Sequence, residues 1–452
     1  MSAADVVVVG AGCAGLSAAT ALAESGVRVT VVEARPICGG RTFATRDRVS
    51  GDWVDNGQHV LFGCYRDTFA YLARNGAARR VRVQASLTVP MIDQHGRTSE
   101  LRCPALPSPL QLAAGVLAWN GLPWRERVAV ARLGPALAGS APPPAGETVR
   151  EWLVRHGQPA ALVAMLWEPL AIAALNQSID RATATTFVEV LRRMLGPGEI
   201  DAAIVMPAVS LSELLIEPAL DYLRGRGGEI LTGAPARLVI RDGRVEGVRV
   251  RDHEIAAGAV VSAVPWHALA ALFDEVPAEL RDVVRDASGL GSAPIVTVNL
   301  WFEGDVLGAA FVGLPGRRFQ WAFDKARVTD GAGRHLSLVC SDAVDLVGRG
   351  NDEIVTLALE ELRGAVPAAR RVPLQRATAV RERRATFSLA AGQPDRPGPH
   401  TGLPGLFLAG DWTDTGLPAT IESAVVSGHR AAAAAQRFPA GPSPQSPGPR
   451  TP

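Results

Sequence analysis

The feature that most constrains this chain lies near its start, where an apolar strand runs directly into a glycine-rich turn. Residues 6–9 are four valines, and the turn Gly10-Ala11-Gly12-Cys13-Ala14-Gly15 follows them without a break. Residues 16–25 have the composition of a helix that packs on a sheet. Gly26 ends that helix, and residues 27–32 form a second apolar strand. This order of strand, turn, helix and strand predicts a βαβ unit that binds a dinucleotide.

Each glycine of the turn has a separate role in such a unit. Gly10 allows the tight turn, Gly12 lets the backbone approach a pyrophosphate, and Gly15 lets the helix lie close to the strand. The N-terminus of the helix offers free N–H groups and a partial positive charge to the phosphates. Glu33 ends the second strand, where it can accept hydrogen bonds from a ribose diol. A carboxylate there repels a 2′-phosphate, so the pattern disfavours NADP.

The residues after Glu33 narrow the choice of cofactor. Cys38-Gly39-Gly40-Arg41-Thr42 resembles the segment that follows the ribose-binding acid in FAD-binding proteins of the amine oxidase and carotenoid desaturase superfamily. The resemblance implies FAD rather than NAD, with Arg41 near the phosphates and the two glycines leaving room for the cofactor. The alternative is that Gly39-Gly40 is an ordinary loop.

Composition restricts the partners and the compartment. A chain of 452 residues that is 47% hydrophobic can bury large cores and should form two or more domains. Lys plus Arg is 46 against 45 for Asp plus Glu, which argues against a nucleic-acid partner. Five scattered cysteines show no metal-ligand spacing and fit a reducing compartment.

The sequence predicts a cytoplasmic protein, with peripheral contact to the inner face of the cytoplasmic membrane as an option. The N-terminus has no basic region or cleavage site typical of a signal peptide. The longest uncharged stretch, residues 103–124, is broken by four prolines and cannot span a bilayer as a helix.

Residues 52–61 contain many polar side chains that could hydrogen-bond a flavin ring. Gly57 permits a close approach of the backbone, and Gln58 and His59 would flank the isoalloxazine. The alternative is a surface turn between strands.

Two later segments are candidates for a lipid site. In residues 101–138, apolar positions including Trp119 precede Trp124-Arg125-Glu126-Arg127, a pattern that suits an interfacial segment or a cap over an apolar pocket. An ordinary core helix explains it equally well.

Residues 158–176 form a long apolar helical pattern interrupted by Glu168 and Pro169. Burial of Glu168 would raise its pKa and suit catalysis, or the residue turns to the surface at a proline kink.

The middle of the chain returns to mixed content. We expect a helix over residues 211–226, a strand at 229–231, a hairpin over 236–251 that turns at Asp242-Gly243, and a strand over 259–265. Flavoproteins of the superfamily have this order, with a strand near the adenine. Residues 266–384 mix helices (269–273, 352–364) with strands (295–302, 336–340). The proline-rich residues 439–452 should be disordered.

The far end of the chain is predicted to return to the flavin. Residues 406–411 form a strand that ends in Gly410-Asp411, and a helix opens near Pro418 and runs to about residue 436. The N-terminus of this helix can face the N1–C2=O edge of a flavin and stabilise negative charge there. Asp411 would bind the ribityl or phosphate region.

The resemblance covers nearly the whole chain and is closest to one group. The C-terminal run LFLAGDWTDTGLPATIESAVVSGHRAA is similar to that of carotenoid and squalene-associated desaturases, and DNGQH with LWEPLAIAALN resembles the bacterial hydroxysqualene dehydroxylases of hopanoid biosynthesis. That family, as the resemblance implies, uses reduced FAD to remove the hydroxyl of hydroxysqualene and give squalene. Amine oxidases carry a lysine on a strand near the flavin, whereas residues 291–295 contain none and Lys325, the single lysine, lies elsewhere.

These patterns together predict an α/β protein: a Rossmann-like, amine-oxidase-like FAD-binding domain with an interleaved α+β substrate domain. Residues 1–85, 205–265 and 385–438 would form the first, and residues 86–204 and 266–384 the second. The reaction needs an acid, for which His59 is the first candidate and Asp55 and Glu168 are reserves. The expected cofactor-binding residues are Gly10, Gly12, Cys13, Ala14, Gly15, Glu33, Ala34, Arg35, Gly39, Gly40, Arg41, Thr42, Gly57, Gln58, His59, Ala236, Gly410, Asp411, Pro418, Thr420 and Ile421.

Two other functions stay open at this point. One is an oxidative desaturase or isomerase that acts on phytoene-like polyenes, and the other is a non-catalytic flavoprotein that carries isoprenoid lipids. The expected partner in each case is a polyprenoid such as hydroxysqualene. The sequence has no second nucleotide site and no iron–sulfur motif, so it does not identify the electron donor.

Overall fold

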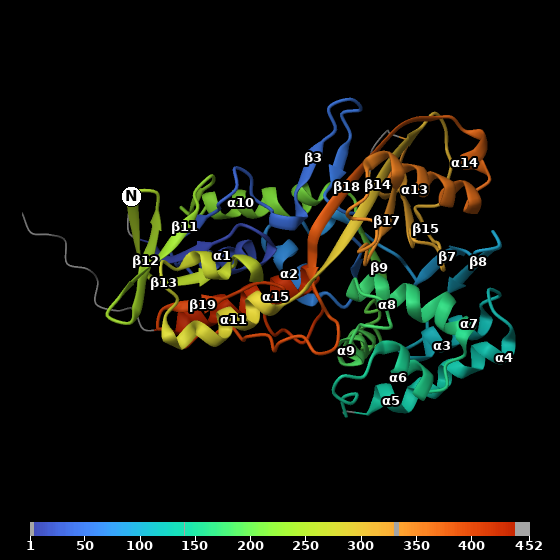
Figure 1. Ribbon diagram of the computed structural model, residues 1–452, viewed down its shortest axis with the longest axis horizontal. Helices are drawn as coiled ribbons and strands as arrows, with labels where there is room; N and C mark the ends of the chain where they lie inside the picture. The colour runs from blue at the N-terminus through green and yellow to red at the C-terminus, as the bar shows by residue number, and fades with distance from the viewer. Residues whose placement is uncertain (1–3, 140, 330–333, 439–452) are drawn as a thin grey trace, which may run out of the picture.

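The computed structural model describes residues 4–139, 141–329 and 334–438. Two seven-stranded sheets dominate it, and they lie toward opposite ends of an elongated molecule (Figure 1). A lobe of short helices lies beneath the second sheet in this view. The tail that was predicted to be disordered falls outside the described residues.

The first sheet contains the predicted βαβ unit. Its order is β10-β2-β1-β13-β12-β11, with β19 beside β13. The strands β1, β2, β10, β13 and β19 run parallel, so their carboxyl ends meet at one edge of the sheet. The bounds of these strands are β1 (Ala4–Val9), β2 (Val29–Val32), β10 (Glu229–Leu231), β11 (Ala236–Arg241), β12 (Arg244–Val250), β13 (His253–Ser262) and β19 (Leu406–Leu408).

The valine runs of β1 and β2 are explained by cover on both faces of this sheet. A parallel strand in such a position carries apolar side chains without alternation. Helices α1 (Cys13–Glu24), α10 (Glu217–Arg224) and α15 (Ile421–Arg437) share one apolar core with these strands. The β11–β12 hairpin turns at Asp242 and Gly243, whose φ angles of 49° and 70° fit the predicted tight turn.

Helices α1 and α15 bring the two ends of the chain into direct contact. The Ser17 hydroxyl donates to the carbonyl oxygen of Val425 at 3.1 Å. Gly428 makes this approach possible, because a Cβ atom there would lie 2.0 Å from Ser17 Oγ and 2.2 Å from the carbonyl oxygen of Ala14. Any side chain at residue 428 would force the helices apart.

The second sheet is mostly antiparallel and has the order β18-β14-β17-β16-β15-β7-β8. Its two long strands, β14 and β18, extend toward the first sheet, while α13 (Asn351–Ala365) covers its outer side with α14 (Ala368–Arg371) (Figure 1). The bounds of its strands are β7 (Thr88–Ile92), β8 (Thr98–Arg102), β14 (Ser292–Phe302), β15 (Phe311–Gly313), β16 (Trp321–Asp324), β17 (His335–Cys340) and β18 (Leu374–Phe387).

The helical lobe is built from residues 110–194. Its helices are α3 (Leu110–Ala118), α4 (Trp124–Arg127), α5 (Gly134–Ala138), α6 (Val149–Arg155), α7 (Ala160–Leu162), α8 (Glu168–Leu175) and α9 (Ala184–Met194). The long helical pattern predicted over residues 158–176 is present, with a π-helical turn (Val163–Trp167) between α7 and α8. Pro169 sits in the first turn of α8, where the missing N–H costs little.

Small elements fill the space between the two sheets. They include the β3 (Ala44–Arg46) and β4 (Trp53–Asp55) ribbon, and a three-stranded sheet of β5 (Leu61–Phe62), β9 (Ile204–Pro207) and β6 (Val81–Val83). Helices α2 (Arg66–Arg74), α11 (Arg281–Gly289) and α12 (Lys325–Val328) complete the chain. We propose the domain boundaries given above because each of the two seven-stranded sheets forms the centre of one domain. Among the described residues, no helix is both long and apolar enough to cross a bilayer.

The contact at Gly428 makes a prediction about stability. Gly428→Ala should lower the free energy of unfolding by about 3 kcal/mol, because the added methyl meets backbone that cannot move aside easily. Urea unfolding followed by circular dichroism measures this change. Gly134→Ala is the matched control, since no atom lies within 4 Å of the added methyl. Equal stability of the two variants would contradict the close packing of α1 and α15.

Candidate functional site: a dinucleotide cradle and an apolar cavity

The glycine turn leaves an open cradle at the carboxyl edge of the first sheet. Gly10 has a φ of 105°, and a Cβ at Gly15 would lie 1.9 Å from the carbonyl oxygen of Gly10, so these positions require glycine. A Cβ at Gly12 would meet only the Cα of Gly40, at 3.9 Å. No side chain caps the N-terminus of α1. The first N–H groups of the helix are therefore left for a ligand.

Glu33 lies directly beside this cradle. Its Oε2 accepts from the N–H of Ala11 at 2.8 Å, and its Oε1 accepts from the N–H of Arg35 at 2.8 Å. A carboxylate has further lone pairs, so Glu33 can still accept from ribose hydroxyls. The N–H of Ala234 donates to the carbonyl oxygen of Glu33 at 2.9 Å, which brings the start of β11, at Ala236, to the same place. Ala34 lies between Glu33 and Arg35.

The segment 39–42 closes the other side of the cradle. The N–H of Gly39 donates to the carbonyl oxygen of Ala11 at 2.8 Å, and Thr42 Oγ1 lies 3.3 Å from Cys13 Sγ. A Cβ at Gly40 would lie 3.3 Å from the Cα of Gly12, so the two glycines face each other. Ala14 is buried in the first turn of α1 behind them.

The C-terminal segment reaches the same edge through an ion pair. Arg41 Nη2 lies 2.5 Å from Asp411 Oδ1, although 370 residues separate them in sequence. Gly410, with a φ of 142°, places Asp411 at the end of β19. The helix α15 begins at Ile421 after the N-cap Thr420, whose side chain accepts from the N–H of Ser423. Pro418 therefore lies just before the first turn.

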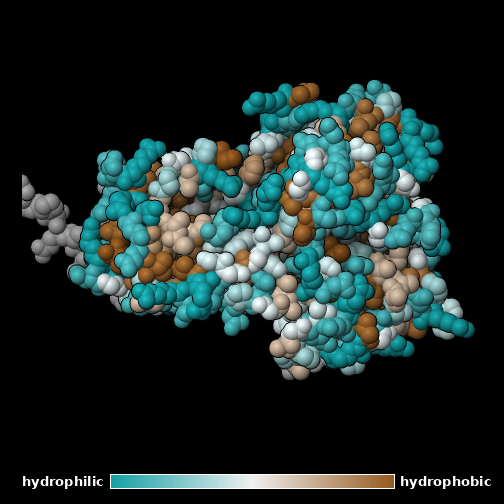
Figure 2. Space-filling model, viewed as in Figure 1, coloured by the Kyte–Doolittle hydropathy of each residue, from teal (hydrophilic) through white to brown (hydrophobic). Residues whose placement is uncertain are grey.

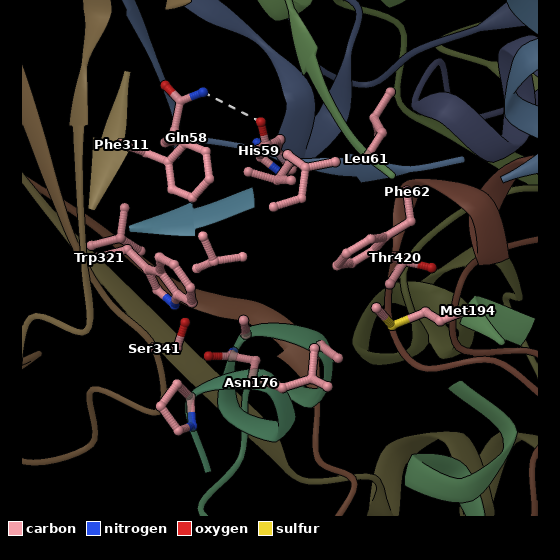
Figure 3. A pocket seen from close by; sticks show the side chains of 18 of the residues that line it. Gln58, His59, Leu61, Phe62, Asn176, Met194, Phe311, Trp321, Ser341 and Thr420 are labelled. Atoms are coloured by element: carbon pink, nitrogen blue, oxygen red, sulfur yellow. Dashed lines mark hydrogen bonds between the residues drawn. The ribbon is translucent and has the colours of Figure 1, made fainter. Parts of the chain in front are cut away.

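A large cavity opens next to this edge, between the second sheet and the helical lobe. It has a volume of about 280 Å³, and apolar side chains make up most of its wall. Figure 3 shows Gln58 and His59 at one side, with Phe311 and Trp321 beside them and Thr420 opposite. Gly57 and Ile421 also line it, so residues 57–59 and the start of α15 meet at this cavity. Residues of the helical lobe form another part of its wall, among them Leu112, Leu166, Leu170 and Met194, and Met194 lies beside Thr420 (Figure 3).

Comparison with known proteins identifies the architecture. A family model described as flavin containing amine oxidoreductase matches residues 13–436. The chain belongs to this family. It is an FAD-dependent oxidoreductase, and the open cradle, uncapped helix and ribose-side carboxylate fit the cofactor. The resemblance inferred from the motifs is thereby confirmed.

The relatives of this flavoprotein are similar to it over nearly their whole length. A hydroxysqualene dehydroxylase of Rhodopseudomonas palustris is 30% identical, with 94% of this chain and 96% of the relative covered. A hydroxysqualene dehydroxylase of Sinorhizobium fredii is 29% identical, with coverage of 95% and 97%. A 15-cis-phytoene desaturase of Synechococcus elongatus is 26% identical, with 94% of each chain covered.

Solved structures support the fold. An oxidoreductase from Methanosarcina mazei superposes with a TM-score of 0.72 at 19% identity, covering 94% of this chain and 98% of that one. A putrescine oxidase variant gives a TM-score of 0.69 at 16% identity, with coverage of 96% and 99%. At these identities the likeness concerns the fold alone. The predicted α/β, amine-oxidase-like class is therefore confirmed.

His59 is the titratable candidate that the flavoprotein brings into the cavity. Its Nδ1 lies 2.7 Å from the carbonyl oxygen of Gly57, and a carbonyl only accepts, so Nδ1 carries a proton and Nε2 is the atom free to exchange one. Burial lowers the pKa of His59, the nearby Lys325 and Arg41 lower it further, and the Gly57 carbonyl and Asp55 oppose them. The imidazolium is thus the minor form at neutral pH.

The two reserve acids do not line the cavity. Asp55 is buried, but its carboxylate binds the ammonium of Lys325 at 2.8 Å and the N–H of Leu211 at 3.0 Å. Glu168 has a side chain that is 34% exposed and lies 3.9 Å from Arg150. Burial raises its pKa, as expected, and Arg150 opposes the shift. The neighbours of Glu168 in α8, rather than Glu168 itself, face the cavity.

The cavity also contains residues that sequence reasoning missed. Glu382 on β18 is the one carboxylate among its described lining residues, and it accepts from Asn56 Nδ2 at 3.0 Å. Asn176, which ends α8 with a φ of 49°, donates to Thr386 Oγ1 at 2.9 Å and so ties the helical lobe to β18. Its place at the end of the LWEPLAIAALN motif was the available signal. Nothing near Glu382 in sequence pointed to the flavin.

Lys325 was set aside in the sequence because it lies far from residues 291–295. The structure places its ammonium 2.8 Å from Gln58 Oε1, directly behind the wall of the cavity. Ile295, in the stretch compared with the lysine-bearing strand of amine oxidases, lines the cavity itself. Lys325 therefore reaches Gln58 from a different part of the chain, directly after β16.

The open space at Gly12 predicts a variant that folds without its cofactor. Gly12→Val should keep the fold, because the added Cβ meets no atom closer than 3.9 Å, but its methyl groups occupy the cradle. The purified variant should be colourless, with a far-ultraviolet circular dichroism spectrum like that of the parent. A folded Gly12→Val protein with a full complement of FAD would falsify the assignment of the pyrophosphate site.

Proposed function

We propose that this flavoprotein is a hydroxysqualene dehydroxylase, which replaces the hydroxyl of hydroxysqualene by hydrogen to give squalene. The observation that carries the proposal is the similarity, over at least 94% of both chains, to relatives named for that activity. The long apolar cavity beside the cradle supports it, since a polyprenoid needs a dry, apolar site. His59 supplies the titratable group that loss of a hydroxyl needs.

The reaction takes up one hydride and one proton and releases water. FAD, when bound in its reduced form, supplies the hydride. The chain must orient the allylic alcohol, exclude water and hold a proton near the hydroxyl oxygen. We assign that proton to Nε2 of His59: the C–O bond breaks as the oxygen accepts the proton, and the cation left on carbon is shared with the neighbouring double bond. The apolar wall keeps water from attacking that carbon.

The helical lobe supplies a surface for contact with a membrane. Trp124 is 66% exposed, and Leu106, Leu110, Leu117 and Val128 are also exposed around it. Leu112 of α3 lines the cavity while Leu110 and Leu117 of the same helix face solvent, so α3 separates the cavity from this surface. The space-filling view shows apolar atoms among polar ones over this lobe (Figure 2). We propose that the lobe rests on a lipid surface and admits the substrate.

One part of the earlier expectation for this segment is wrong. Trp119 is only 1% exposed and belongs to the main core, so it cannot contact lipid. The segment is thus both alternatives at once: Trp119 and Val116 pack inward as an ordinary core, and Trp124 lies outside.

A polyene desaturase is the second candidate, because phytoene desaturases are also similar over 94% of this chain. Desaturation removes a hydride and a proton from the substrate and has no hydroxyl to protonate. Turnover of hydroxysqualene with dithionite-reduced FAD, without turnover of phytoene by the oxidised enzyme, supports the dehydroxylase. The reverse result supports the desaturase, and reduction of bound FAD without any product supports a lipid carrier.

The role of His59 predicts a loss of turnover that depends on the leaving group. His59→Ala should lower turnover of hydroxysqualene by roughly 10²–10⁴-fold, the usual effect of losing a general acid. In the acetate ester of the same alcohol, acetate is the leaving group and departs without needing that proton. The variant should therefore recover most of its rate on the ester. Equal slowing on both substrates would mean that His59 only positions the cofactor.

The pH dependence follows from the same group. Because the pKa of His59 is lowered by burial, its protonated fraction is small at neutral pH and grows as the pH falls. Single-turnover rates with hydroxysqualene should therefore rise as the pH falls below about 6.5, the ordinary value for histidine. His59→Ala should remove this rise. A parent enzyme whose rate falls over that range would contradict the assignment.

The exposed patch predicts a loss of membrane binding. Leu110→Ser/Trp124→Ser should reduce sedimentation with liposomes and raise the apparent KM for the lipid, with the FAD content unchanged. Val49→Ser/Val344→Ser is the matched control, because both valines are more than half exposed and lie outside the lobe. Unchanged partition of the first variant would show that the patch does not contact lipid.

A further inference from the structure

The buried lysine behind the cavity wall makes two contacts that define the orientation of a neighbouring amide. Lys325 is only 7% exposed, at the start of α12. Its Nζ lies 2.8 Å from Asp55 Oδ2 and 2.8 Å from Gln58 Oε1. An ammonium group can only donate hydrogen bonds, so the carbonyl oxygen of Gln58 has to face it.

The nitrogen of this amide lies beside the backbone of His59, another residue of the cavity wall. The Nε2 group of Gln58 donates one hydrogen bond to the carbonyl oxygen of His59, at 3.3 Å (Figure 3). An amide nitrogen carries two N–H groups, so a second donor remains for a group in the cavity. If the amide flipped, it would place its NH₂ against the ammonium and present an acceptor instead.

The ion pair between Asp55 and Lys325 is itself fixed by the elements that carry these two residues. Asp55 ends β4, and its second oxygen accepts from the N–H of Leu211 at 3.0 Å. Lys325 follows directly on Asp324, the last residue of β16. A buried ion pair is in general weak evidence for a contribution to stability, because desolvation offsets the attraction. The Lys325–Asp55 pair also contacts the Gln58 amide, which lines the cavity, so it can orient that amide whatever it contributes to stability.

We propose that Lys325 is a positioning residue, whose ammonium fixes the Gln58 amide so that its NH₂ group is presented to the flavin. This inference deepens the proposed function and rests on the ring lying against residues 57–59. A fixed donor favours ligand atoms that accept hydrogen bonds, as the carbonyl oxygens and unprotonated nitrogens of a flavin do. The single lysine of the chain thus acts on the cofactor through a neighbour.

The test compares variants by the visible spectrum of bound FAD and by its dissociation constant, neither of which needs a substrate. Asp55→Asn/Lys325→Met removes both charges, so no buried carboxylate is left unpaired. Gln58→Glu keeps an acceptor for Lys325 but has no NH₂ group. Both proteins should show a changed flavin spectrum and bind FAD about fivefold more weakly, as expected for one lost hydrogen bond.

Two further proteins make the result decisive. Combining the charge-free pair with Gln58→Ala should add no loss beyond that of Gln58→Ala alone, because Lys325 acts on the flavin only through the Gln58 amide. Lys325→Arg keeps a cation that donates, so it should retain most of the parent affinity and spectrum. A folded Asp55→Asn/Lys325→Met protein with the parent spectrum and affinity overturns the role of Lys325, provided that Gln58→Ala alters them.

The remaining outcome concerns the premise. If Gln58→Ala also leaves the spectrum and affinity unchanged, the flavin does not lie against Gln58, and the placement of the cofactor and the role of Lys325 both fail. Turnover of hydroxysqualene can still be measured in that case. Failure of the inference and failure of the proposed substrate are therefore distinguishable.

Discussion

The rest of this structure depends on the carboxyl edge of a parallel sheet, where strands from both ends of the chain stop together. Because β1, β2, β13 and β19 run parallel, the residues that follow them lie at one edge, although β1 and β19 are about as far apart in sequence as the chain allows. The Arg41–Asp411 ion pair and the close packing at Gly428 join the N-terminal and C-terminal segments at this edge. The apolar cavity opens beside the cradle at this junction, where Arg41 and the start of α15 both contribute to its wall.

Local signals in the sequence predicted most of this arrangement. The valine runs, Gly10, Gly15 and the Asp242-Gly243 turn have conformations set by their own backbone or by neighbours close in sequence, and each is found as predicted. Within residues 101–138, the sequence did not show which apolar side chains are buried and which are exposed. Trp119 and Trp124 have similar sequence surroundings, and only the fold of the lobe places one in the core and the other in solvent.

The contacts behind the cavity wall could not be predicted from the sequence, for a related reason. Lys325 meets Gln58 across 267 residues, and Asn56 meets Glu382 across 326. No periodicity or spacing encodes such a pair, because it depends on how β16 and β18 run past residues 55–58 in space. Family resemblance misled as well, because it directed attention to residues 291–295, which contain no lysine, and away from Lys325.

Five polar or charged residues line the part of the cavity near the cradle, and their position bears on the chemistry. These residues are Arg41, Asn56, Gln58, His59 and Glu382, whereas the helical lobe contributes mostly apolar side chains, with Gln111 and Asn176 as its polar ones. Arg41 and Glu382 are tied to other groups, Arg41 to Asp411 and Glu382 to Asn56, whereas Nε2 of His59 is left free by the bond at Nδ1. A lowered pKa makes the imidazolium scarcer but a stronger acid when it forms. His59 can give one proton to the hydroxyl oxygen, which leaves as water and keeps that proton. The imidazole then has to take up another proton from solvent before the next turnover, so one acid of the chain is enough for the reduction of an allylic alcohol.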